Sequence, residues 1–187
     1  MRMDKLSVIN AALMKCGLPP AASLLDVDWG ASARFDDVAE QLLRAHAWNF
    51  ATTHATPGKT EAPAHGYLYA YALPADCVRV IDVRPAEDIR APQARFSVVG
   101  ERIYTNAAPC NLRYVRRMTD PADWPVDFAD AVAARLAAEI APLAAQSFGL
   151  GASLLQLAQL AFQQAQAADA AERREFLPMR SSYIEVR

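Results

Sequence analysis

Three histidines, His46, His54 and His65, are the side chains that could act as an imidazole base. An enzyme with a nucleophile needs such a base within hydrogen-bond reach and a further group that orients it. His46 falls on the apolar side of an expected helix, and the other two lie in a segment rich in threonine and proline. The spacing of His46 and His54 fits no zinc pattern such as His-Glu-x-x-His. The histidines therefore predict neither a catalytic site nor a metal site.

Paired carboxylates are the second kind of group that could carry chemistry. The pairs are Asp26 with Asp28, Asp36 with Asp37, and Glu87 with Asp88. None of them has the alternating ligands and central glycine of a calcium loop. Adjacent acids on a helix also point in different directions, so they cannot both face one site. We expect solvated surface charge at all three places.

Phosphate-binding and cysteine motifs are missing as well. Neither a Walker-type loop nor Gly-x-Gly-x-x-Gly occurs among the 7 glycines. Cys16, Cys77 and Cys110 are widely spaced and form no Cys-x-x-Cys pair, which indicates buried thiols rather than a disulfide framework or a zinc site. The sequence thus predicts no enzymatic reaction, no cofactor and no metal, and favours a structural or interaction protein. An enzyme with an unfamiliar site is the alternative that missing motifs leave open.

Two groups of side chains are candidates for contacts with partners. Three tyrosines alternate along an expected strand, and three arginines surround Tyr114. These residues are Tyr67, Tyr69, Tyr71, Arg113, Arg116 and Arg117. Arginines beside an aromatic ring can contact a nucleic-acid backbone, whereas arginines on a strand also form salt bridges at a surface or between subunits. The sequence favours salt bridges and leaves both interpretations open.

Composition and charge set the broad class of the protein. The 187 residues are 53% hydrophobic and 21% charged, which is typical of one globular unit with its own core. Residues 66–117 carry 8 basic and 5 acidic side chains, and residues 118–187 carry 5 and 9. This difference can support contacts between copies of the chain, but it is far from the basic surface of a dedicated DNA-binding domain.

No membrane contact is expected. The sequence has no run of about 18 apolar residues, and its first residues lack the apolar region of a signal peptide. We therefore expect a protein that is made in the cytosol.

Apolar residues at spacings of three and four predict helices at residues 4–16, 29–50, about 128–143 and 152–174. Asp4 is the expected N-cap of the first helix. Pro142 should kink or divide the third helix, and Gly149 with Gly151 should separate it from the fourth. The fourth helix should bury one face, made of Leu154, Leu157, Ala161, Ala165 and Ala168.

The periodicity changes to two in the middle of the chain, which predicts strands. We expect them at 67–72, at 77–83, in a hairpin through Gly100 and Glu101, and from Asn111, after an irregular connector at 52–66. The predicted fold is α+β, mainly α, in a single domain of residues 1–187. An antiparallel helical bundle (1–52 and 118–175) would carry an inserted small antiparallel β-meander (66–117) and a tail (176–187).

The order of these segments resembles the tail tubular protein A family of podovirus-type phages. Three motifs carry the likeness, in the order of the family: Trp48-Asn49-Phe50-Ala51, Tyr71-Ala72-Leu73-Pro74-Ala75-Asp76-Cys77 followed by Val78-Arg79-Val80, and Thr119-Asp120 leading to Trp124-Pro125 and Phe128. Each motif is short, and their common order is the specific signal. The likeness extends from about Met3 to Arg174.

This resemblance implies a structural adaptor without catalysis or cofactor. Copies of the chain would form a twelvefold ring at the head-to-tail junction of a phage or prophage virion. The ring would join the portal protein to the tail nozzle protein, tail tubular protein B, around the channel through which genomic DNA passes without sequence-specific contact. The protein would be made in the host cytoplasm and kept in the virion.

The end of the chain matches no motif of that family. Tyr183, Ile184 and Val186 form a short apolar run after Pro178, and such a run can add a strand to the sheet of a partner. A frayed terminus is the alternative. On the residues alone, a cytosolic helical regulator or a nucleic-acid-binding module that uses Arg113–Arg117 is the alternative function.

Overall fold

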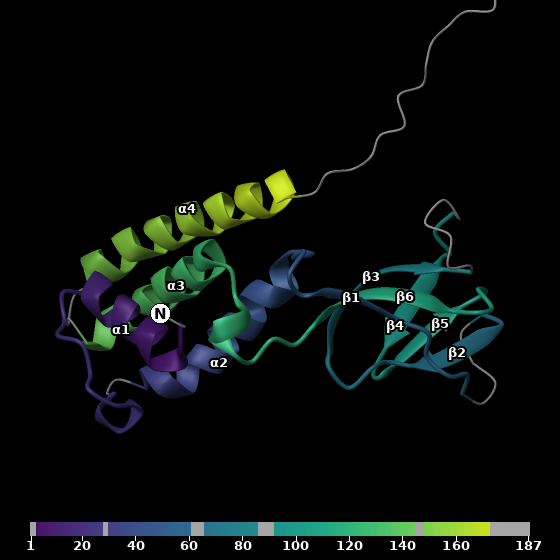
Figure 1. The fold of residues 1–187 in the computed structure, drawn as a ribbon, viewed down its shortest axis with the longest axis horizontal. Coiled ribbons are helices and arrows are strands. Elements are labelled where there is room, and N and C mark those ends of the chain that lie inside the picture. The colour runs from purple at the N-terminus through teal and green to yellow at the C-terminus, as the bar shows by residue number, and fades with distance from the viewer. Residues whose placement is uncertain (1–2, 28–29, 61–65, 86–91, 145–147, 173–187) are drawn as a thin grey trace, which may run out of the picture.

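The structure is a computed structural model that describes residues 3–27, 30–60, 66–85, 92–144 and 148–172. Within these ranges the fold is α+β, with helices gathered at one end of the long axis and strands at the other (Figure 1). The elements are α1 (Lys5–Lys15), α2 (Ala31–Ala45), β1 (Thr52–Ala55), β2 (Tyr69–Ala72), β3 (Cys77–Arg84), β4 (Phe96–Val99), β5 (Arg102–Thr105), β6 (Asn111–Arg116), α3 (Val126–Ala144) and α4 (Phe148–Glu172), with short 3₁₀ turns at Leu24–Asp26 and Pro121–Asp123.

Residues next to the first two helices determine where these helices begin and end. Asp4 caps α1 as predicted, because its Oδ1 accepts a hydrogen bond from the backbone N–H of Ser7 at 2.8 Å. Helix α2 begins after Gly30, which has a φ of 70°. It ends at Ala45, five residues before the predicted end at residue 50. His46 has an extended backbone (φ −138°, ψ 157°) and turns the chain towards β1.

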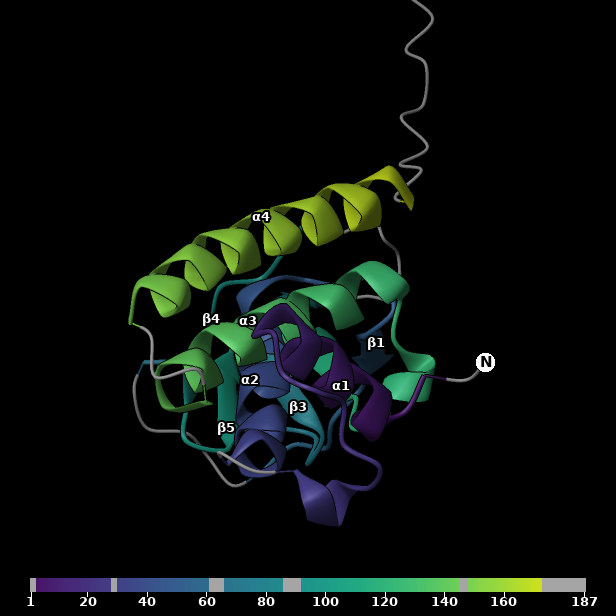
Figure 2. The same cartoon turned by 90° about the vertical axis from the view of Figure 1, so that its left-hand side faces the viewer.

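Helix α3 is the centre of the helical part of the molecule. It packs against α1, α2 and α4, and α4 lies along it in Figure 2. The sequence predicts an apolar stripe of Phe128, Val132, Leu136, Ile140 and Leu143. The first four are buried, but Leu143 is 58% exposed, so the prediction was wrong for the last of them. The helix continues through Pro142 to Ala144, so the proline does not divide it.

The glycines near the start of α4 have a different role from the predicted one. Gly149 and Gly151 lie inside the first turns of α4, not between two helices. Gly151 is buried, and a Cβ atom at this position would lie 3.2 Å from Cγ of Pro142. Glycine therefore permits the close approach of α4 to the end of α3.

The buried face of α4 is rotated relative to the predicted face. It contains Leu154, Ala158, Ala161 and Ala165, and it ends in Asp169, whereas Leu157 is 43% exposed. The prediction of a buried Leu157 was therefore wrong. Hydrophobicity alone places leucine inside and aspartate outside, but Asp169 has polar partners in the interior, as described below.

The strands form two antiparallel sheets, with strand orders β1-β6-β3 and β2-β5-β4. This order differs from the predicted single meander, because β6 lies between two strands that are distant from it in sequence. Strand β1 was also missed: its Thr-Thr-His-Ala sequence lacks the alternation of apolar residues, and pairing with β6 orders it (Thr52 opposite Val115). The β4–β5 hairpin is confirmed, and Gly100 supplies a φ of 59°.

We call residues 52–116 the β unit and the helices with their loops the helical body. The β unit has its own core, made of Tyr71, Val83, Ile103, Ala107, Cys110, Leu112 and Tyr114. Of the buried residues that the structure describes in the β unit, two pack into the core of the helical body instead: Val78 and Val115. The chain enters the β unit after Ala51 and leaves it at Arg116. These two points lie together, because the backbone N–H of Arg116 donates to the carbonyl of Ala51 at 2.8 Å.

No helix in the described ranges combines the length and the apolar composition that a membrane span requires.

Candidate interaction surfaces

The three tyrosines have different positions in the β unit. Tyr71 is 2% exposed, and its hydroxyl donates to the carbonyl of Ala107 at 2.8 Å. Tyr71 is therefore a core residue and cannot contact a partner at the surface. Tyr69 is half-buried beneath Lys59, whose Nζ lies 4.0 Å from the ring centroid. Tyr67 precedes β2 and is half-buried, so these two rings remain candidates for a partner contact.

Arg113 on β6 and Arg117 just after it form ion pairs within the chain. Arg113 Nη2 lies 2.7 Å from Oδ2 of Asp82, which is 2% exposed. Arg117 contacts both carboxylate oxygens of Glu40 on α2, from Nε and from Nη2, at 3.2 Å each. Arg116 is exposed, and its side chain makes no ion pair with a residue that the structure describes. The salt-bridge interpretation therefore applies to two of the three arginines.

We expect the replacement of Arg113 by alanine to lower the free energy of unfolding by about 2 kcal/mol, because it leaves a buried carboxylate with weaker partners. Arg84 Nε and Gln93 Nε2 lie 3.5 Å from Asp82 and compensate in part. Arg116→Ala on the same strand is the matched control and should change stability by less than about 0.5 kcal/mol. Urea denaturation measures both. Equal effects would contradict a structural role for the pair between Arg113 and Asp82.

A polar cluster that the sequence did not predict fixes the far end of α4. Oδ1 of Asp169 accepts from the backbone N–H of Asn49 at 2.7 Å, and the Asn49 side chain donates to the Asp169 carbonyl at 2.6 Å. His46 Nε2 lies 3.3 Å from Asp169 Oδ2, and Gln166 Nε2 lies 3.4 Å from His46 Nδ1. His46 thus joins α2 to α4 in a structural cluster. His54 is exposed on β1, and His65 lies outside the described residues.

The other groups that could carry chemistry do not converge. Among the described residues, no three His, Cys, Asp or Glu side chains come close enough together to hold a metal ion. Cys16 and Cys110 are buried and Cys77 is half-buried. Burial raises the pKa of the Cys110 thiol to about 11, so it stays protonated at neutral pH and is a poor nucleophile. Burial, and then the hydrogen bond with Asp76, raise the pKa of Tyr114 to about 12.

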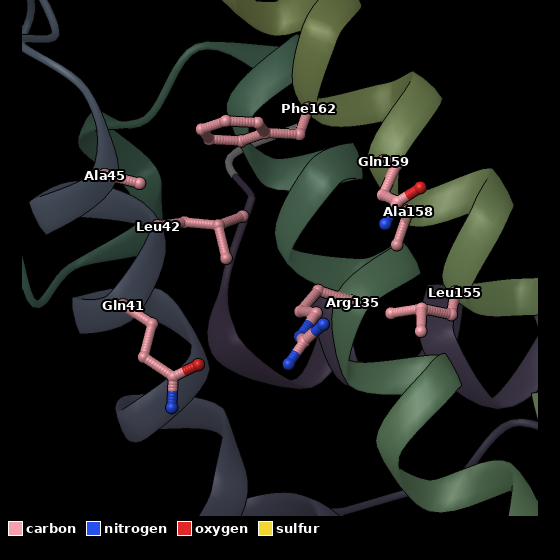
Figure 3. A pocket seen from close by; sticks show the side chains of 8 residues that line it. All are labelled: Gln41, Leu42, Ala45, Arg135, Leu155, Ala158, Gln159 and Phe162. Atoms are coloured by element: carbon pink, nitrogen blue, oxygen red, sulfur yellow. The ribbon is translucent and has the colours of Figure 1, made fainter.

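An apolar groove lies between α2, α3 and α4, with a volume of about 240 Å³ (Figure 3). Leu42 and Phe162 point towards it from opposite sides, and Arg135 lies at its floor on α3. The lining residues are Gln41, Leu42, Ala45, Arg135, Leu155, Ala158, Gln159 and Phe162. Arg135 pairs with Glu139 at 3.2 Å, so the groove has no unpaired charge among these residues. We call it the α2–α4 groove.

The outward face of α4 is the second unusual surface. No charged residue occurs between Glu139 and Asp169, although much of this stretch is exposed helix. Leu157 and Leu160 are 43% and 57% exposed on this face. The exposed side of a helix at a protein surface is usually rich in charge. The helical periodicity predicted a buried Leu157 and so did not indicate this surface. The absence of charge over so long a stretch was the signal that could have indicated it.

The remaining candidates Tyr183, Ile184 and Val186 lie outside the described residues. A scan against protein-family models and a search of curated proteins found no match for this chain.

Proposed function

We propose that this chain is a structural head-to-tail adaptor of a phage or prophage virion. Copies of it would form a twelvefold ring between the portal protein and the tail nozzle protein, tail tubular protein B, around the path of the DNA. The helices would act as an antiparallel bundle, with the β unit as an insertion in one adaptor domain. The order of the three sequence motifs carries this proposal, and the positions of their residues support it.

The residues of these motifs form packing contacts. The Trp48 ring lies 5.0 Å from that of Phe128, which in turn lies 5.1 Å from Trp124. Asn49 binds Asp169 on α4, and Asp76 accepts from the hydroxyl of Tyr114 at 3.1 Å. The motifs thus stabilise the helical body and the β unit. Packing roles of this kind favour a structural protein.

The elongated arrangement gives the adaptor two ends. The helical body and the β unit lie at opposite ends of the long axis (Figure 1). A protein that joins two different partners needs two surfaces that do not overlap, and this arrangement supplies them. We propose that one partner binds the body and the other binds the β unit, near Tyr67 and Tyr69.

The ion pairs of Arg113 and Arg117 within the chain reduce the expected contribution of charge to contacts between copies. The excess of basic residues in 66–117 suggested ionic contacts with the acidic helices of the next copy. Arg113 and Arg117 are already paired within the chain, so fewer cations are free for such contacts. The same pairs weaken the alternative function as a nucleic-acid-binding module, which needs arginines free for phosphates. We therefore propose that apolar surface contributes more than charge to contacts between copies.

Electron microscopy of the full chain mixed with the portal protein of the same genome tests the proposed function. We expect rings of this chain seated on the portal. A chain that stays dispersed beside the portal, with no change of mass in sedimentation, would refute the adaptor function. Tight, salt-dependent binding to free duplex DNA under the same conditions would support the nucleic-acid-binding module instead.

A further inference from the structure

Six exposed residues on α4 form a continuous line along its outward face. They recur at alternating spacings of four and three: Ser153, Leu157, Leu160, Gln164, Ala167 and Ala171. This spacing corresponds to a period of about 3.5 residues, which is typical of a helix side that packs along another helical surface. We call this line the outer seam. Its two leucines lie in the N-terminal half, and its alanines allow a close approach in the C-terminal half.

The outer seam cannot contact the α2–α4 groove of its own chain. Successive residues of an α-helix are about 100° apart around the axis, so Leu160 points about 140° away from Leu155, which lines the groove. It points about 160° away from Phe162 on the other side of the groove opening. The seam and the groove therefore open in different directions from the same helix. The seam of one copy therefore cannot fill the groove of the same copy.

The two surfaces match each other in size and in charge. An apolar cavity of about 150 Å³ holds one benzene molecule. The groove, with about 240 Å³, therefore has room for about two aliphatic side chains. Leu157 and Leu160 are about one turn apart and supply two such side chains. No charge would be buried unpaired, because the seam is uncharged and the groove's Arg135 has Glu139 as its partner.

We infer that the outer seam of one copy docks into the α2–α4 groove of the next copy, so that the partner is a second copy of this chain. This inference rests on the proposed function, for which it names the surfaces that join neighbouring subunits. The contact uses two different patches on each copy, so an open row of copies keeps one free seam at one end and one free groove at the other until a ring closes. A contact of seam with seam would instead stop at a dimer.

Disulfide trapping between two variants, each with one introduced cysteine beside the three native ones, tests the contact. Gln41→Cys places a thiol at the groove, and Leu160→Cys places one on the seam. We expect a disulfide-linked dimer when the two variants are mixed and oxidised, and much less when either variant is oxidised alone. The unsubstituted chain, oxidised in parallel, gives the background from Cys77. Dimers from Leu160→Cys alone that equal those from the mixture would show a seam-to-seam contact and overturn the inference.

Removal of the leucines gives an independent readout. Both are exposed, so Leu157→Gln combined with Leu160→Gln should leave the monomer folded. We expect self-association, measured by sedimentation, to weaken by about 100-fold or more, because two apolar side chains no longer leave water. The matched control is Leu25→Gln, since Leu25 is 96% exposed and lies in a 3₁₀ turn away from both surfaces. Equal effects of the two changes would contradict a specific seam.

The same trapping on portal-bound rings separates this inference from the proposed function. Rings without the disulfide between the introduced thiols would overturn the inference and leave the adaptor function intact. The disulfide in the concentrated chain, together with no binding to portal, would support the seam contact and refute the adaptor function. A disulfide that forms only after residues 173–187 are removed would show that the chain's own end occupies the groove, and this outcome would also overturn the inference.

Discussion

Replacing Trp48 with alanine is expected to lower the free energy of unfolding by about 4 kcal/mol, the largest effect of any single change considered for this protein. The side chain is 1% exposed, and its ring lies 5.0 Å from that of Phe128 and 5.8 Å from that of Phe162. Its Nε1 also donates to the carbonyl of Leu42 at 2.9 Å. Alanine would leave a cavity where α2, α3 and α4 meet. Urea denaturation followed by circular dichroism measures the loss.

Two further variants show whether the Trp48 effect comes from packing. Trp48→Phe keeps an aromatic ring and loses the N–H donor, so it should cost about half as much as alanine. Leu25→Ala removes a side chain that is 96% exposed and should stay within about 0.5 kcal/mol of the unsubstituted chain. A loss below about 1 kcal/mol for Trp48→Ala would contradict the central place of this ring in the helical body.

The second large effect is expected at Asp169. Replacing it with alanine should lower the free energy of unfolding by about 2–3 kcal/mol, because the partly buried N–H of Asn49 loses a charged acceptor at 2.7 Å. Asp169 is 7% exposed, so water replaces the lost acceptor poorly. The contact of Asn49 with the Asp169 carbonyl remains in the variant and limits the loss. Amide hydrogen exchange would then show faster opening of the C-terminal half of α4.

Asp130→Ala is the matched control for Asp169→Ala. Asp130 also lies on a helix and binds a cation, with its Oδ1 at 2.9 Å from Lys15 Nζ, but its side chain is 53% exposed. An exposed ion pair contributes about 0–1 kcal/mol, so this change should have a small effect. If the two aspartates gave the same loss, the polar cluster at the end of α4 would not anchor that helix.

The sequence predicted those elements whose own residues carry a strong pattern. Helix α1 has a capping aspartate and a regular apolar stripe, and the β4–β5 hairpin has a glycine at its turn. Strand β1 and the sheet order were not predicted, because they depend on pairing between distant segments, such as Thr52 with Val115 and Tyr71 with Ile103. The prediction for α4 failed at Leu157 because the periodicity of a helix in which most residues are apolar or uncharged does not fix which side faces the body.

The candidate surfaces were predictable only in part. Arginines on an expected strand favoured the salt bridges of Arg113 and Arg117, but their partners Asp82 and Glu40 come from other elements and could not be assigned. Tyr71 shares its spacing with Tyr67 and Tyr69, yet it lies inside the β unit, because alternation predicts a common side and not which side is buried. The α2–α4 groove depends on three helices whose relative placement no local pattern specifies.

The hydrogen bond between Arg116 and Ala51 has a consequence for how such a protein can change over evolutionary time. It holds the two points where the β unit leaves and rejoins the helical body at neighbouring positions. A segment whose two ends are adjacent can be replaced or lengthened without changing the fold of the chain on either side. If the β unit binds a partner as proposed, its far end can change while Val78 and Val115, which belong to the core of the body, stay the same.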